Sequence, residues 1–165
     1  MDGFVNALIS DKKSNTIPDE DDLFGPLVGN WDFVWIDNNQ SRKVQGEWFF
    51  RRVLEGRAIQ DIFICPSRAS RESNPQPDGE YGSTFRIYNP GTKKWDISYG
   101  CTGYITRLQA EREGSKVVLT NIINKNEKWV FSEIKDDSFH WQNVRVMGNG
   151  DWHINADLYA SRRKE

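Results

Sequence analysis

From residue 27 onward, short runs rich in β-branched and aromatic residues alternate with clusters of Gly, Asn, Asp and Pro. Apolar runs bounded by turn-forming residues are typical of β-strands. In the second half of the chain the turn clusters recur about every dozen residues without a helical segment between them, the spacing of antiparallel strands joined by hairpins. The pattern predicts ten strands, at residues 30–36, 43–54, 58–65, 83–88, 94–100, 104–111, 116–123, 128–134, 139–147 and 152–159.

Ten antiparallel strands in sequence order would leave two exposed edges if they formed an open sheet, and closure removes both. We therefore predict an all-β fold: a single closed antiparallel meander β-barrel of about ten strands. Because a barrel of about eight strands already holds one small ligand, ten strands predict an internal cavity. The one long break, residues 66–82, contains three prolines. It predicts a surface loop and a candidate lid at the barrel mouth.

The first 26 residues follow a different pattern. Their leading apolar residues fall at helical spacing, namely Phe4, Val5, Leu8 and Ile9, and predict a short amphipathic helix over residues 1–9. Pro18, followed by four carboxylates at residues 19–22, predicts a second short helix that ends at Gly25 and Pro26. We expect a helical N-terminal arm, residues 1–26, that plugs or flanks one end of a barrel domain, residues 27–165.

Composition narrows the function classes. The 165 residues include 22 Lys+Arg and 24 Asp+Glu, a balance that gives no broad basic field to attract phosphate backbones. No apolar run reaches the roughly 20 residues of a membrane span, and the start of the chain lacks a signal-peptide pattern. We expect a cytoplasmic protein that binds neither nucleic acid nor membrane. The 7 Trp, 9 Phe and 5 Tyr indicate a core built from few, large side chains.

Several segments resemble a known group of proteins. Gly29-Asn30-Trp31 resembles the Gly-x-Trp opening of the lipocalins, with Arg162 placed to supply their cationic cap over the tryptophan. Four further segments are similar to uncharacterised bacterial small-barrel proteins of the calycin type: Gly46-Glu47-Trp48-Phe49-Phe50, Leu54 to Asp61, Arg86 to Pro90, and Asp137 to Trp141. The resemblance covers most of residues 27–163 and implies a lipocalin-like or fatty-acid-binding-protein-like barrel. It implies no activity, because the fold hosts transport, haem binding and isomerisation.

Asp61 is the most informative polar residue, because it lies within a run, residues 58–65, that is otherwise suited to burial on both faces. A lone buried carboxylate costs several kcal/mol, so it needs a cationic or hydrogen-bonding partner. We expect Arg86 or Arg145 to be that partner. A structural ion pair that fixes strand register is favoured; a ligand anchor or a general acid/base is the alternative.

Strand alternation then selects the candidate lining of the cavity. Thr84, Arg86 and Tyr88 share one face of their strand, which we predict points inward. Three further faces would join it: Trp141 with Asn143 and Arg145, Trp31 with Phe33 and Trp35, and Trp48 with Phe50 and Arg52. The predicted ligand-binding residues are Trp35, Trp48, Asp61, Arg86, Tyr88, Trp141, Asn143 and Arg145. Plain core packing is the alternative for each tryptophan and is favoured for Trp31.

Metal and cofactor signals are weak. Cys65 and Cys101 lie far apart without a second pair, so neither a disulfide framework nor a zinc site is indicated. His140 has the opposite parity to Trp141, so it should face outward, which disfavours an axial haem ligand. In the last strand, one face is apolar and includes Ile154 and Leu158, and the other face contains His153. We expect the apolar face to point into the barrel. We predict no metal and no cofactor.

Three functions are open at this point. The first is binding of a small, mostly apolar ligand inside the barrel, either anionic or carbonyl-bearing, with Arg86 and Tyr88 orienting its polar end. The second is a cofactor-free isomerase, cyclase or lyase that uses Asp61 or Tyr88 as acid/base in the same pocket. The third is an interaction module whose N-terminal arm swaps onto a neighbouring subunit and makes a homodimer.

Overall fold

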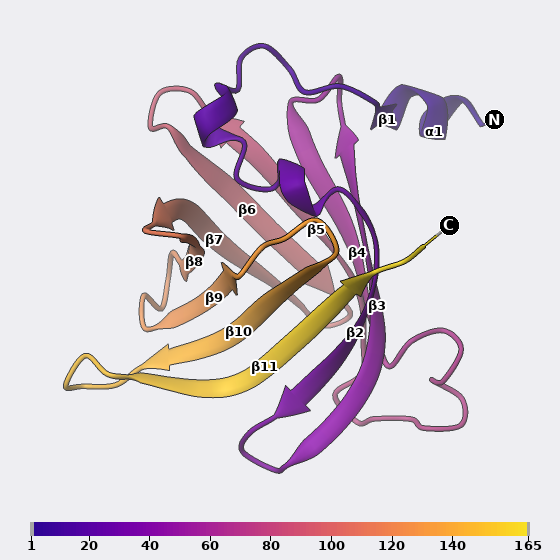
Figure 1. The fold of residues 1–165 in the computed structure, drawn as a ribbon, viewed down its shortest axis with the longest axis vertical. Helices are drawn as coiled ribbons and strands as arrows, with labels where there is room; N and C mark the ends of the chain where they lie inside the picture. The colour runs from indigo at the N-terminus through magenta and orange to yellow at the C-terminus, as the bar shows by residue number, and fades with distance from the viewer. Residues whose placement is uncertain (1, 165) are drawn as a thin grey trace.

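The computed structural model describes residues 2–164 and has an all-β fold with a short N-terminal helix (Figure 1). Ten strands, β2 to β11, follow one another as an antiparallel meander, and the last, β11, pairs with the first, β2. This pairing closes the sheet, so none of the ten strands keeps a free edge. The closed ten-stranded barrel predicted from the sequence is confirmed.

The elements lie within three residues of the predicted strand bounds. The barrel strands are β2 (Gly29–Asp37), β3 (Arg42–Val53), β4 (Ala58–Cys65), β5 (Glu80–Asn89), β6 (Lys94–Cys101), β7 (Tyr104–Glu113), β8 (Lys116–Asn121), β9 (Glu127–Ser132), β10 (Ser138–Val146) and β11 (Trp152–Arg162). Before them come helix α1 (Gly3–Leu8), the two-residue strand β1 (Ile9–Ser10) and two 3-10 turns, η1 (Asp19–Asp21) and η2 (Gly25–Leu27). Strand β1 adds to β3, with Ile9 opposite Val53.

The segment between β1 and β2 crosses one end of the barrel, the upper end in Figure 1, and closes it. Its apolar side chains belong to the same buried cluster as the barrel core: Ile17, Leu23, Phe24 and Leu27. Polar contacts fix it in place, because the Arg52 guanidinium donates to both carboxylate oxygens of Asp22 at 3.1 and 2.7 Å. The second predicted helix is only the single turn η1, and Gly25 and Pro26 begin η2 rather than end a helix. The division into an arm, 1–26, and a barrel domain, 27–165, stays a prediction.

Helix α1 lies to the side of the barrel (Figure 1) and buries none of its residues. Asp2 caps it, because its carboxylate accepts hydrogen bonds from the backbone N–H groups of Phe4 and Val5. Phe4 is 73% exposed, whereas Leu8 is partly buried, so the predicted apolar face of this helix is only partly covered. The arm swap that would make a homodimer stays a prediction.

Trp31 is fully buried beside the closed end, and its indole Nε1 donates to the carbonyl of Leu27 at 2.8 Å. The Arg162 guanidinium lies 4.3 Å above its ring and donates to the carbonyls of Val28 and Pro26. Gly29 is required here: its φ is +142°, and a Cβ would stand 2.2 Å from the guanidinium. The predicted packing of Arg162 over Trp31 is confirmed, with the core role favoured for that tryptophan.

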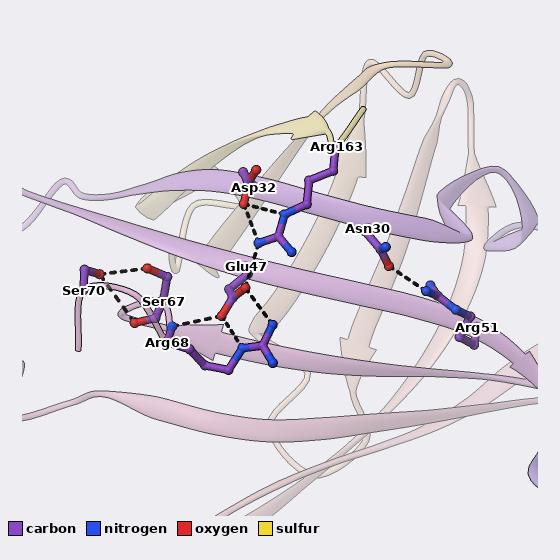
Figure 2. Close-up of polar contacts among 8 residues, drawn as sticks. All are labelled: Asn30, Asp32, Glu47, Arg51, Ser67, Arg68, Ser70 and Arg163. Atoms are coloured by element: carbon purple, nitrogen blue, oxygen red, sulfur yellow. Dashed lines mark hydrogen bonds and ion pairs between the residues drawn. The ribbon is translucent and has the colours of Figure 1, made fainter. Parts of the chain in front are cut away.

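The outer wall carries a buried carboxylate, Glu47 on β3 (Figure 2). It accepts hydrogen bonds from the backbone N–H, Nε and Nη2 of Arg68 and from Nη2 of Arg163, all between 2.7 and 3.1 Å. Arg163 also pairs with Asp32 on β2. The hydrogen bonds from Arg68, opposed by burial, lower the pKa of Glu47 from 4.5 to about 2. This network ties β2, β3, the loop after β4 and the C-terminal residues together.

A lowered carboxyl pKa gives a stability contribution that is complete above the unfolded-state pKa and lost as pH falls through the folded-state value. Between pH 5 and pH 2, Glu47 should therefore cost the wild type about 2 kcal/mol of unfolding free energy, discounted because Arg68 is half exposed. Urea titrations at these two pH values should show that Glu47→Gln loses that much less than the wild type does. Glu55→Gln, in an exposed turn pair with Arg57, serves as the control and should leave the pH dependence unchanged.

The last hairpin contains a β-bulge. Register between β10 and β11 shifts after Asn143, which pairs with Ala156, whereas Val144 pairs with Ile154. The extra residue, Asn155, reverses the side-chain alternation of β11 beyond it. The prediction for this strand is therefore correct only in part: Ala156 and Leu158 are buried in the barrel, but Ile154 packs into a separate cluster with Val118, Val130 and Val144.

Candidate functional site

The barrel contains a cavity of about 590 Å³ that opens at the end opposite the N-terminal segment. Its walls combine aromatic rings with polar groups. The lining residues are Trp35, Trp48, Phe63, Glu80, Thr84, Arg86, Tyr99, Tyr104, Thr106, Asn124, Asn126, Glu127, Trp129, Phe131, Trp141, Asn143, Arg145, Val146 and Asn155. On β5 the lining runs from Glu80 to Arg86, seven residues of strand that span about 20 Å. The cavity is thus long enough for an elongated molecule.

Arg86 forms the deep end of the cavity. It is 1% exposed, and its guanidinium lies over the rings of Phe24, at 4.9 Å, and Phe50, at 5.2 Å. Its Nη2 donates to Oδ2 of Asp61 at 2.8 Å, and the other carboxylate oxygen accepts from the backbone N–H of Thr84 at 2.9 Å. The expected partner of Asp61 is therefore Arg86, and the two form a fully buried ion pair.

Three donors at this site have no acceptor among the described residues: Nε and Nη1 of Arg86 and Nε1 of Trp48. Both side chains line the cavity, and Trp48 is only 4% exposed. Buried N–H groups are nearly always hydrogen-bonded in folded proteins, because an unpaired one loses its hydration without compensation. Such groups, on side chains that line a cavity, indicate a place where an acceptor atom from outside the chain can bind.

Aromatic side chains form the middle of the cavity. Trp48 is their centre, with its ring 4.9 Å from that of Phe63, 5.5 Å from Phe131 and 6.2 Å from Trp141. Trp141 also contacts Trp129 at 6.1 Å. Edge-to-face and tilted ring pairs at these separations form a rigid apolar surface. It suits the flat or hydrophobic body of a small molecule.

The open end is polar. Glu80 accepts hydrogen bonds from the hydroxyls of Tyr99 and Tyr104, both at 2.8 Å. Burial, followed by the charge of Glu80, holds the pKa of Tyr99 and of Tyr104 well above the ordinary tyrosine value. Both phenols therefore stay protonated at neutral pH and act as hydrogen-bond donors to the carboxylate. This cluster fixes one wall of the opening.

Six of the eight predicted ligand-binding residues are brought together around the cavity: Trp35, Trp48, Arg86, Trp141, Asn143 and Arg145. Arg86 lies at the deep end and Arg145 at the opening, where it is exposed. Asp61 does not line the cavity, because both of its oxygens are engaged behind Arg86. Asp61 therefore takes the role that the sequence favoured, as one member of a structural ion pair.

Tyr88 faces inward, as predicted, but too close to the closed end to reach the cavity. Its hydroxyl donates to Oδ2 of Asp21 at 2.6 Å, and this bond, followed by burial, raises the pKa of Tyr88 to about 12. Neither candidate acid/base, Asp61 or Tyr88, is exposed to the cavity in this structure. Their geometry gives no support to the isomerase, cyclase or lyase alternative.

Sequence reasoning missed several lining residues. Trp129 and Tyr99 could have been found by the alternation that selected Trp141, because each shares a face with buried neighbours on its own strand. Glu80 was missed because strand β5 begins three residues earlier than predicted. Asn155 lines the cavity only because of the bulge, for which the sequence has no marker.

The long loop between β4 and β5 projects away from the barrel wall (Figure 1). Arg68 anchors its start to Glu47, and Arg42 anchors its end through Gln76 and Asp78. None of the loop residues 66–79 lines the cavity. The surface loop is confirmed, but in this conformation it does not act as the predicted lid.

The histidines lie outside the cavity lining. Nε2 of His140 is 2.6 Å from Oδ1 of Asp157, and its ring stacks on Tyr159 at 4.5 Å, so His140 faces outward as predicted. Nε2 of His153 lies 2.9 Å from the Oδ1 of Asn39. Within residues 2–164, no three His, Cys, Asp or Glu side chains are grouped so that they could hold a metal ion. No helix in the described range is long and apolar enough to cross a membrane.

Comparison with known proteins supports the fold alone. Searches against protein-family models and against curated proteins return no match to this chain. Among solved structures, the chain is similar to Rv2717c from M. tuberculosis, with a TM-score of 0.55 at 11% identity over 93% of this chain and all of that one. A redesigned β-barrel gives a TM-score of 0.46 at 10% identity over 86% of this chain and 96% of that chain. The first of these places the chain among small β-barrels.

Proposed function

We propose that this protein binds a small, mostly apolar molecule inside the barrel, with the acceptor atom of the molecule at Arg86 and Trp48. The observation that carries this proposal is the set of three buried donors, without acceptors in the described chain, that line a 590 Å³ cavity. Pockets for small molecules are mostly apolar and orient their ligand with a few convergent polar groups. The ring cluster around Trp48 and Trp141 supplies the apolar part.

The sequence resemblance described above also supports a proposal about the family. We propose that the chain belongs with the calycin-type barrels, since it combines their Gly-x-Trp opening with an arginine over that tryptophan. Ligand binding inside the barrel is a use of that fold, and the physiological role of the ligand is left open. The polar end of the ligand would be oriented by Arg86 without Tyr88, whose hydroxyl is engaged by Asp21.

Narrowing the cavity should reduce ligand binding. Thr106 lines the cavity on β7, and Thr106→Trp would place an indole in that space. We expect this variant to weaken binding of the neutral fluorescent ketone 6-propionyl-2-(dimethylamino)naphthalene (prodan) at least about tenfold, because lost apolar contact of about two methylene equivalents is worth that much. The measurement is a fluorescence titration with the purified protein.

The matched control is Arg107→Trp, which adds the same side chain at the next position, on the outward face of β7. It should bind prodan as the wild type does. Equal weakening by the two variants, or no saturable binding by the wild type, would contradict binding inside the barrel.

A further inference from the structure

We infer that the cavity selects a neutral carbonyl compound, such as an aromatic ketone, amide or ester, over the carboxylate of the same shape. This inference rests on the proposed function, since it specifies the chemical class of the molecule that binds at Arg86 and Trp48. A deep arginine alone would suggest a carboxylate ligand. The charges around this arginine instead disfavour a carboxylate.

Asp61 already balances the charge of Arg86. The Asp61 Oδ2 and the Arg86 Nη2 are 2.8 Å apart, and the side chains of both residues are at most 1% exposed, so water does not screen the pair. A ligand carboxylate beside the guanidinium would leave two negative groups around one positive group in a dry environment. Burying such an unbalanced charge is strongly unfavourable. A neutral acceptor leaves the pair of Arg86 and Asp61 with no net charge.

The remaining charged groups act in the same direction. The cavity is lined by two acidic residues, Glu80 and Glu127, and two basic residues, Arg86 and Arg145. With Asp61 directly behind Arg86, three negative charges face two positive ones, so the site has a net charge of −1. Glu127 and Arg145 are exposed at the opening, where water screens them, so the excess negative charge that disfavours an anion is that of Glu80.

The free donors match a carbonyl oxygen. Nε and Nη1 of Arg86 and Nε1 of Trp48 can only donate, and each lacks an acceptor among the described residues. A carbonyl oxygen offers two lone pairs and no hydrogen that would need its own partner. Nε–H and Nη1–H point to different sides of the guanidinium, so one carbonyl oxygen can accept from one of them, and the Trp48 Nε1–H is a second donor at the same site. A hydrocarbon of the same shape would leave these donors unpaired.

The test is a competition titration with three compounds of similar shape: 2-acetylnaphthalene, 2-naphthoate and 2-ethylnaphthalene. Each is used to displace prodan from the wild-type protein at pH 7.5. We expect the ketone to bind at least about tenfold more tightly than either the carboxylate or the hydrocarbon, since a charge-assisted hydrogen bond is worth at least that factor. This ranking needs no variant, so it cannot be lost through misfolding.

A charge variant gives the second arm. Asp61→Asn keeps the shape of the side chain and its acceptor for the Thr84 N–H but removes the charge that balances Arg86. It should shift the preference from 2-acetylnaphthalene toward 2-naphthoate at least about tenfold, a change that a purely structural role of Asp61 would not produce. Asp32→Asn, which removes a carboxylate from the outer wall, should leave the ratio unchanged.

The outcomes separate this inference from the proposed function. If 2-naphthoate binds the wild type as tightly as 2-acetylnaphthalene does, or if the ketone fails to displace bound prodan, the inference is overturned and binding inside the barrel stands. An unchanged preference in a folded Asp61→Asn protein also overturns it. If prodan itself does not bind, the proposed function fails.

Discussion

Replacing Arg86 with methionine is expected to lower the free energy of unfolding by about 3–5 kcal/mol, because it leaves the buried Asp61 carboxylate without its counter-ion. The backbone N–H of Thr84 would remain as the single donor to that carboxylate in the described structure. Methionine retains most of the contact with Phe24 and Phe50, so the loss reports on the charge rather than on packing. Urea unfolding followed by tryptophan fluorescence measures it.

A double variant separates the two contributions. Adding Asp61→Asn to Arg86→Met removes the stranded charge and should restore about 2 kcal/mol of that loss. Arg57→Met, which breaks the exposed pair with Glu55, should cost less than about 1 kcal/mol. If the Arg86 and Arg57 variants lose similar stability, Asp61 and Arg86 do not form a buried pair.

The second large effect is expected at the closed end. Phe24 is fully buried, and its ring packs edge-on against Trp95 at 5.3 Å and Phe131 at 6.1 Å and lies over the Arg86 guanidinium. Phe24→Ala should therefore lower the free energy of unfolding by about 3–5 kcal/mol, the usual loss when a buried aromatic ring is replaced by a methyl group. Thermal and urea unfolding measure the change.

Phe4→Ala is the matched control within the same N-terminal region. Because Phe4 is 73% exposed on α1, this variant should change stability by less than about 0.5 kcal/mol. Losses of the same size in the two variants would mean that residues 15–27 do not close the barrel. The contrast also locates the functional boundary of the arm, since only its second half contributes to the core.

The strands were predictable because both signals that define them are local. Alternation of inward and outward residues and the turn residues between runs appear directly in the chain, and the meander leaves few alternative orders once closure is assumed. The start of β5 was missed because Gly82 reads as a strand breaker. In the structure Gly82 packs against the Tyr99 side chain, where a Cβ would stand 2.4 Å from the hydroxyl oxygen.

The site was predictable only as far as regular alternation holds. Arg86 and Trp141 were found because their strands are regular up to the cavity. The deep limit of the cavity could not be predicted, because it depends on where Phe24 crosses the barrel. That long-range contact keeps Tyr88 out of the cavity lining. The position of Asn155 depends on a bulge in the pairing of β10 with β11. No residue type in β11 predicts that bulge.

Proton–nitrogen NMR of the tryptophan indoles, during a titration with 2-acetylnaphthalene, shows whether an acceptor binds to the free donors inside the barrel. The Nε1–H of Trp48 has no acceptor in the described chain, whereas those of Trp31 and Trp95 are bonded to the carbonyls of Leu27 and Asp21. We predict a large downfield shift of the Trp48 signal, assigned with Trp48→Phe, while the Trp31 and Trp95 signals stay in place. Saturable binding that leaves the Trp48 indole unshifted would contradict it.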